Sequence, residues 1–307
     1  MPDFGQDISH GPEESPGYGQ PAAPADKLAF VLSGGGALGS VQVGCLQLLL
    51  EHGIFPDLIV GTSVGALNGV FLAKNPTLDG VAQLKELWLS LGPHGPFKEG
   101  RLRVMLRLFS GREHLYGNSS LRKLVYQYVG DATFESLEVP AMVVATNMET
   151  GEPAVFSRGA VEPAVLASTA IPGVFPPINI GGVEYVDGAM MSNCGLETAW
   201  NHGARRMVVI ETPHVPPDKA VGILKPLSRA LQVAMIRLCH REVDWFSEKC
   251  PVALLEPEVP LEGFTFDDFS RTPDLLERGK AWTENFIQSD RGQLLRSFAR
   301  NRQEERV

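Results

Sequence analysis

The sequence has no long run of apolar residues. None of its stretches reaches the roughly 18 consecutive apolar residues that a membrane-spanning helix needs. Residues 1–27 carry acidic residues early and contain no apolar core of the kind that a secretory leader requires. We therefore expect neither a transmembrane helix nor a signal peptide.

Cysteine is also scarce. The chain has four cysteines, Cys45, Cys194, Cys239 and Cys250, and they form no CxxC pair. Their spacing to nearby histidines is not that of a metal site. We expect reduced thiols buried in the core, and no bound metal. Because reduced thiols are typical of reducing compartments, this pattern predicts a cytoplasmic protein, in contact with a membrane at most from its surface.

Positive charge is in deficit. The 27 Lys and Arg residues are outnumbered by 36 Asp and Glu residues, which gives a net charge of −9. Such a balance argues against nucleic acid as a partner. The hydrophobic fraction of 44% in 307 residues is sufficient for one large α/β domain.

The hydrophobic pattern alternates between short apolar runs and helical periodicity from about residue 27 onward. Residues 1–26, rich in Pro, Gly, Ser and Glu, are expected to be disordered. We predict one domain over 27–290, a mostly parallel sheet covered by helices on both sides, and a basic helix or tail over 291–307. Strands are expected over 28–33, 57–63, 140–148, 153–157, 205–213 and 251–257, and helices over 38–52, 64–74, 81–91, 225–248, 273–287 and 290–302.

A glycine-rich loop separates the first expected strand from the first helix. Gly34, Gly36 and Gly39 fit the G-x-G-x-x-G spacing of a dinucleotide site, but amides at a helix start also stabilise an oxyanion. A dinucleotide site needs an acidic residue at the end of the second strand, whereas Asp57 stands at the start of that strand. No Walker lysine follows the glycines. A nucleotide-binding regulator is thus the weaker alternative.

The second expected strand runs into a serine motif. Residues 61–65 read Gly-Thr-Ser-Val-Gly, which is the G-x-S-x-G nucleophile elbow between a strand and a helix. In such a turn the serine hydroxyl is pushed outward, and the flanking glycines avoid clashes in the tight bend. This context predicts Ser63 to be a nucleophile.

Ser63 needs a base, and the residues alone leave two candidates open. In a Ser-Asp-His triad, His202 or His214 would follow the acid in chain order. In a Ser-Asp dyad, a carboxylate would accept the proton directly. The carboxylate candidate is Asp187, which follows a β-rich run and precedes Gly188.

Three motifs occur in a characteristic order: GGGALG at 34–39, GTSVG at 61–65 and DGA at 187–189. With VATNMETGEPAVF at 144–156 and ASTAIPGVFPP at 167–177, the chain resembles the patatin-like phospholipase family over about residues 27–213. The resemblance implies a three-layer α/β/α sandwich with a mostly parallel sheet. It also implies a hydrolase that cleaves lipid carboxylic esters, such as phospholipids or lysophospholipids, without a cofactor or metal.

Residue by residue, the resemblance makes Ser63 the nucleophile and Asp187 its base, and it disfavours a histidine base. It assigns the oxyanion amides to Gly34, Gly35 and Gly36. The remaining motif glycines are Gly39, Gly61, Gly65 and Gly188. The sequence departs from the usual family pattern at Ser33 and Asn147, and neither residue belongs to the dyad.

Residues 101–109, RLRVMLRLF, combine an apolar helical face with Arg103 and Arg107 on the opposite side. This pattern fits a helix at a membrane surface, and it also fits a helix packed on the core with solvated arginines. The tail 291–307 carries five arginines against two glutamates. That excess is typical of a solvated surface and also suits contact with an acidic one.

Overall fold

The computed structural model describes residues 26–93, 117–192, 194–213, 224–259 and 268–300. The expected disordered segment 1–26, apart from Asp26, and the expected helix 101–109 lie outside these residues. No helix within the described ranges has both the length and the apolar character to span a bilayer.

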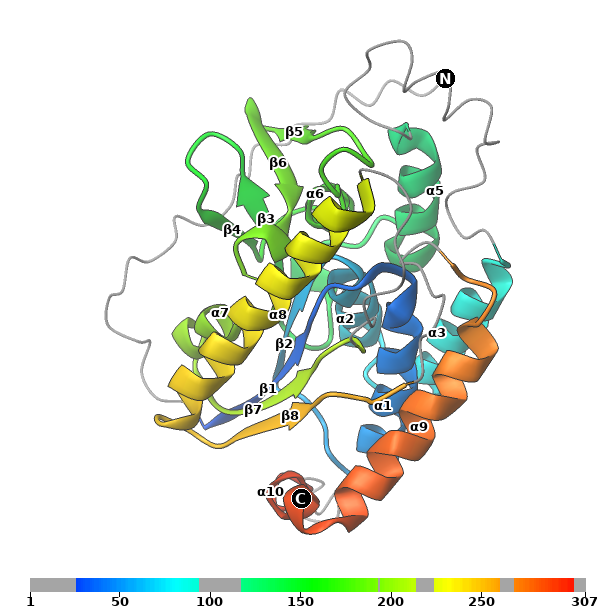
Figure 1. Ribbon diagram of the computed structural model, residues 1–307, viewed down its shortest axis with the longest axis vertical. Helices are drawn as coiled ribbons and strands as arrows, with labels where there is room; N and C mark the ends of the chain where they lie inside the picture. The colour runs from blue at the N-terminus through cyan, green and yellow to red at the C-terminus, as the bar shows by residue number, and fades with distance from the viewer. Residues whose placement is uncertain (1–25, 94–116, 193, 214–223, 260–267, 301–307) are drawn as a thin grey trace.

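One sheet forms the centre of the described structure (Figure 1), with strand order β5-β6-β3-β2-β1-β7-β8 and β4 paired to β3. Neighbouring strands from β3 to β8 along this order are parallel, whereas β4 and β6 run antiparallel to β3, and β5 antiparallel to β6. The strands are β1 (Lys27–Leu32), β2 (Leu58–Thr62), β3 (Ala141–Asn147), β4 (Pro153–Phe156), β5 (Ile178–Ile180), β6 (Val183–Asp187), β7 (Ala204–Ile210) and β8 (Val252–Leu255).

Helices cover both faces of the sheet. The larger core contains residues of α1 (Gly39–Glu51), α2 (Val64–Lys74), α3 (Leu78–Ser90), α5 (Asn118–Val129), α6 (Val161–Ser168) and α9 (Thr272–Gln288). The smaller core contains residues of α7 (Leu196–Asn201) and α8 (Leu224–Ser247), and Figure 1 shows α8 crossing that face. The predicted three-layer α/β/α fold is therefore confirmed.

Strand β1 shows why the chain forms three layers. Phe30 and Leu32 pack into the larger core, whereas Ala29 and Val31 pack into the smaller one. Successive side chains of a strand point to opposite faces, so an unbroken apolar run fits only a strand buried on both sides. The run of apolar residues in β1 thus determines its central place in the sheet.

Several elements differ from expectation. The short helix α6 was not predicted; Pro163 lies in its first turn, where proline is tolerated. The expected helix over 290–302 is instead the 3₁₀ turn η4 (Asp290–Gly292) followed by α10 (Gln293–Arg296). Gly292 lies against the carbonyl groups of Phe286 and Ile287, so the chain turns back onto the end of α9.

The basic tail is partly engaged within the molecule. Arg300 forms an ion pair with Asp57, and its backbone N–H donates to the carbonyl of Gly53. Arg296 donates to the carbonyl oxygens of Ile287 and Ser289. These two arginines therefore hold α10 against the body of the protein.

The expectation of four reduced cysteines is wrong for one pair. Cys194 and Cys239 form a disulfide, with their Cα atoms 5.4 Å apart and a separation of 45 positions in sequence. Cys45 and Cys250 are free and buried, as expected. The pairing depends on how α8 packs over the segment before α7, which the spacing of the cysteines does not reveal. Cysteine usage therefore gives no support to a cytoplasmic location.

Candidate active site

Ser63 occupies a sharp turn between β2 and α2. Its backbone has φ 54° and ψ −124°, and it is the only non-glycine residue with positive φ in the part of the chain that the structure describes. Such a conformation costs a non-glycine residue about 1–3 kcal/mol and is concentrated at functional sites. The geometry is the one expected of a nucleophile elbow.

The two glycines of this motif permit the close packing around Ser63. A Cβ atom on Gly65 would lie 2.2 Å from the carbonyl oxygen of Leu32, and one on Gly61 would lie 2.5 Å from that of Gly65. Both obstacles are backbone atoms, which cannot move aside as a side chain can. The start of α2 therefore approaches β1 and β2 only with glycine at these positions.

Ser63 and Asp187 meet across 124 residues of sequence. The Ser63 hydroxyl donates to Asp187 Oδ2 at 2.6 Å, and the backbone N–H of Ala189 donates to Asp187 Oδ1 at 2.9 Å. Asp187 ends β6, and its main-chain carbonyl accepts a hydrogen bond from the Thr146 hydroxyl on β3. The carboxylate is thus fixed at both oxygens and aimed at the serine.

Burial changes the acidity of Asp187, which is only 4% exposed. Desolvation raises the pKa of this carboxyl from 3.8 to about 6, against the lowering effect of its bonds from Ser63 and Ala189. A base is most effective when its pKa lies near the working pH. Asp187 is therefore a stronger proton acceptor than an exposed aspartate while remaining ionised at neutral pH.

Ser168 holds the backbone of the serine elbow in place. This residue was not identified from the sequence. Its hydroxyl accepts a hydrogen bond from the Ser63 backbone N–H at 2.8 Å and donates to the Val144 carbonyl at 2.6 Å. It thereby links the end of α6, the strand β3 and the strained residue. The only sequence signal was its place in the motif segment 167–177.

The glycine loop before η1 (Gly36–Leu38) is held by the segment that follows β7. Thr212 donates from its hydroxyl to the Gly34 carbonyl at 2.7 Å, and its backbone N–H donates to Ser33 Oγ at 2.9 Å. The buried Gln42 amide donates to the Ser33 carbonyl at 2.9 Å. The Ser33 that departs from the family pattern therefore anchors the loop.

A mostly apolar pocket opens beside Ser63 and reaches the glycine loop at Gly36. It contains roughly 500 Å³ of empty space, part of it open to solvent. It is lined by Gly36, Ser63, Val64, Leu67, Trp88, Leu91, Leu121, Leu124, Tyr128, Thr169, Ile171, Phe175 and Phe269. Such a lining suits a hydrocarbon chain.

The structure does not bring His202 to the serine. His202 precedes β7, whereas Ser63 follows β2, and both strands run parallel to β1. The seven residues of β7 separate the two ends of the sheet by about 20 Å. His202 Nδ1 lies 2.7 Å from the Thr198 carbonyl of its own helix. The other histidine candidate, His214, lies outside the described residues.

Asp57 is likewise occupied in a way that does not fit a nucleotide site. Its carboxylate accepts a hydrogen bond from the backbone N–H of Leu28 at 2.7 Å and pairs with Arg300. It lies at the amino end of β2, away from the glycine loop, which follows the carboxyl end of β1.

Similarity to known proteins identifies the family of this chain. The family described as Patatin-like phospholipase matches residues 30–200, more than half of the chain. The chain belongs to the patatin-like phospholipase family. The matched segment contains the serine elbow, the glycine loop and Asp187.

Two relatives within this family illustrate the range of similarity. An uncharacterized NTE family protein of Mycobacterium tuberculosis strain H37Rv is 29% identical over 224 residues, which cover 72% of this chain and 36% of the relative. The Lysophospholipase NTE1 of Cryptococcus neoformans is 26% identical over 194 residues, covering 62% of this chain and 11% of the relative. The chain therefore spans only a minor part of the length of these relatives.

Among solved structures, human GIVD cytosolic phospholipase A2 resembles the chain with a TM-score of 0.52 and 11% sequence identity. The match covers 88% of this chain and 59% of the human one. At this identity the likeness concerns the fold alone.

Proposed function

We propose that this patatin-like protein is a serine hydrolase of lipid carboxylic esters, with a phospholipid or lysophospholipid as substrate. One observation carries the proposal: the strained Ser63 donates a 2.6 Å hydrogen bond to the buried Asp187 at the wall of an apolar pocket. An apolar pocket accepts an acyl chain and places its ester carbonyl beside the serine. The relative named a lysophospholipase supports the choice of substrate class.

The reaction needs only groups present in this chain. The Ser63 oxygen attacks the ester carbonyl while its proton passes to Asp187. The tetrahedral intermediate then expels the alcohol, which takes that proton, and leaves an acyl-enzyme. Water attacks the acyl group with Asp187 again accepting a proton, which returns to Ser63 as the acid departs.

The amides of Gly34, Gly35 and Gly36 are the proposed oxyanion donors. Gly36 lines the same pocket as Ser63, and the loop is anchored through Ser33 and Thr212. Removing one donor of this type typically costs about 3 kcal/mol in the transition state. The α2 amino terminus just after the elbow adds a positive field where the oxyanion forms.

A fluorophosphonate probe and a series of esters with increasing acyl length test the proposal. We expect the probe to modify Ser63, and Ser63→Ala and Asp187→Asn each to abolish hydrolysis with an unchanged circular dichroism spectrum. Ser40→Ala is the matched control, because Ser40 is also buried and its hydroxyl donates to the nearby Ala37 carbonyl, away from Asp187. Full activity in Asp187→Asn, with loss in His214→Ala, would replace the dyad by a triad.

We also propose that the protein meets lipid at a membrane surface through residues 101–109. The arginines of that segment suit anionic headgroups. In a liposome flotation assay, the double variant Arg103→Glu/Arg107→Glu should float less than wild type. Equal flotation would remove this segment from the lipid contact while leaving the dyad untouched.

A further inference from the structure

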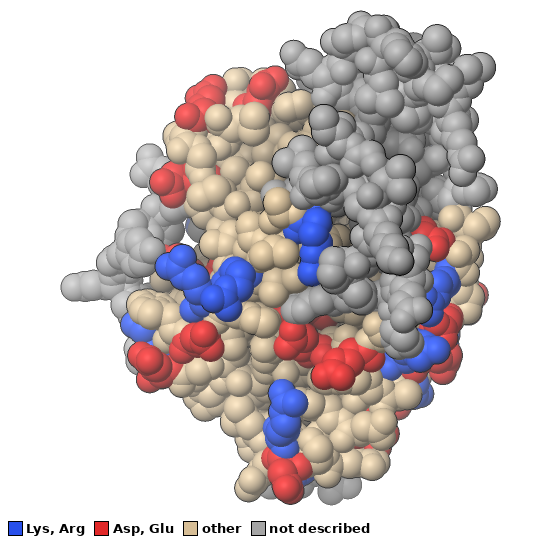
Figure 2. Space-filling view, in the orientation of Figure 1, with Lys and Arg blue, Asp and Glu red and all other residues tan. Residues whose placement is uncertain are grey.

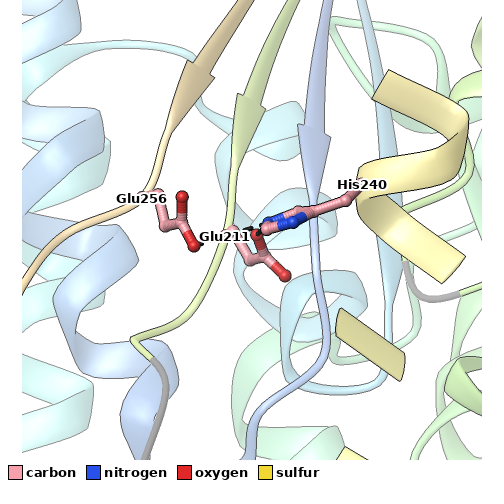
Figure 3. Close-up of side chains that lie close together, drawn as sticks. All are labelled: Glu211, His240 and Glu256. Carbon is pink, nitrogen blue, oxygen red and sulfur yellow. Dashed lines mark ion pairs between the residues drawn. The ribbon is translucent and has the colours of Figure 1, made fainter. Parts of the chain in front are cut away.

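Three side chains of metal-binding type meet at the carboxyl ends of β7 and β8, outside the ester site. Glu211 directly follows β7, Glu256 directly follows β8, and His240 lies on α8 above them. Figure 3 shows the two carboxylates and the imidazole pointing toward one another. None of these residues has a part in the proposed hydrolysis.

The register of the two strands explains why the carboxylates come together. Ile210 and Leu255 are paired neighbours, and both pack into the larger core. Because side chains alternate along a strand, the residues that follow, Glu211 and Glu256, point to the opposite face of the sheet, where α8 lies. The backbone N–H of Glu211 also donates to the Leu255 carbonyl at 2.9 Å, which keeps the two segments in register just beyond the strands.

The spacing of the three groups fits a metal ion. His240 Nε2 lies 3.3 Å from a Glu211 carboxylate oxygen and 3.4 Å from a Glu256 carboxylate oxygen. One ligand atom from each residue lies within 4.8 Å of the others. Zinc bonds of about 2.0–2.2 Å at tetrahedral angles place neighbouring ligand atoms about 3.4 Å apart. Two of the three separations already equal that tetrahedral edge.

Charge balance also supports a metal ion between these three side chains. Glu211 is only 1% exposed, and burying a carboxylate is costly unless an opposite charge compensates it. A divalent cation bound to a neutral imidazole and two carboxylates forms a group with no net charge. Mixed imidazole and carboxylate ligands are typical of zinc sites.

We propose that Glu211, His240 and Glu256 bind a divalent transition metal ion, with Zn²⁺ preferred. Three protein ligands leave the fourth tetrahedral position for water. The ion would fasten α8 to the ends of β7 and β8. Glu211 adjoins Thr212, the residue that anchors the glycine loop, so the ion would stiffen the wall behind the ester site. The metal proposal does not depend on the proposed ester hydrolysis, because the two use different residues.

Calorimetric titration of the full, chelator-treated chain with ZnCl₂ tests the proposal. We expect one site in wild type and at least a 10-fold weaker affinity in His240→Ala, since losing even an outer-shell partner costs roughly 10- to 100-fold. Glu256→Gln, at a partly exposed position, should weaken binding similarly and decides the matter if His240→Ala does not fold. A metal that binds only the folded state should also raise the melting temperature of wild type.

His52→Ala is the matched control, because it removes a surface imidazole that lies 3.0 Å from a single carboxylate, that of Glu284. This variant should bind Zn²⁺ and gain melting temperature as wild type does. The proposal is overturned if wild type takes up no Zn²⁺, as expected of a proton-bridged triad. It is also overturned if His240→Ala and Glu256→Gln bind as tightly as His52→Ala, because the ion would then lie elsewhere.

Discussion

At the scale of single residues, Asp187 combines two opposing demands. As the proposed base it must be ionised, yet it is only 4% exposed at the end of β6, where a charge is poorly solvated. Two hydrogen bonds, from Ser63 and from the Ala189 amide, only partly compensate that burial, since the pKa remains raised to about 6. The same burial therefore strengthens the base and destabilises the folded protein when the carboxyl is charged.

The first prediction concerns the pH dependence of hydrolysis. Ser63 loses its proton only to an ionised Asp187, whose pKa is about 6. We expect kcat/KM for a neutral ester to rise as the pH increases and to level off above an apparent pKa near this value. Initial rates measured from about pH 4 to about pH 8 check it. A rate that is constant across this interval would contradict a carboxylate base.

The second prediction concerns stability. Because the pKa of Asp187 is raised in the folded state from 3.8 to about 6, its stabilising contribution is complete below 3.8 and is lost as the pH rises through 6. Relative to Asp187→Asn, wild type should thus lose roughly 3 kcal/mol of unfolding free energy across that window. Urea unfolding at both ends of the window measures it.

Ser63→Ala is the control for this measurement, because it retains Asp187 and removes only a hydrogen bond that lowers the pKa of that carboxyl. Its pH dependence should therefore be at least as large as that of wild type. The same slope in Asp187→Asn and in Ser63→Ala would show that the dependence comes from other groups.

At the scale of elements, the elbow depends on how closely α2 approaches β1. The third prediction is that Gly65→Ala lowers the unfolding free energy by at least about 2 kcal/mol, because its Cβ would meet the Leu32 carbonyl at 2.2 Å. Gly69→Ala in the same helix is the comparison and should cost less, since its Cβ would meet side-chain methyl groups, of Ile59 at 2.9 Å and of Leu32 at 3.8 Å, and no backbone atom. Thermal and urea unfolding measure the loss of unfolding free energy in both variants. Equal losses would contradict a specific clash with the Leu32 backbone.

The elements also show what local sequence can predict. The serine elbow and the position of Asp187 were predicted because each motif is only a few residues long and its chemistry depends on immediate neighbours. His202 could be set aside by geometry only when β7 was placed parallel to β1 and β2. Ser168 acts through hydrogen bonds to residues 24 and 105 positions away, and no local pattern reports such contacts.

At the scale of the whole molecule, α8 connects the segment after Asp187 to the β8 edge of the sheet. Figure 2 shows the face of the molecule on which α8 lies, with acidic and basic side chains scattered over it. Cys239 bonds to Cys194, and Glu242 accepts hydrogen bonds from the Ser192 hydroxyl and the Leu196 amide. One turn of α8 thus fixes the chain shortly after the proposed base. These contacts join distant parts of the sequence, so the cysteine spacing could not predict them.

The final prediction concerns this disulfide. Closing a loop of about 45 residues restricts the unfolded chain and is worth about 2–4 kcal/mol. The double variant Cys194→Ser/Cys239→Ser should lose stability of this order, more than Cys250→Ser, which alters a free thiol in the same core.

A reductant should lower the melting temperature of wild type but not that of the double variant. Because the disulfide lies next to the segment that carries Asp187, hydrolysis should fall in parallel. If all four cysteines of the denatured, unreduced protein react with a thiol reagent, the disulfide is absent and α8 is held by packing and Glu242 alone.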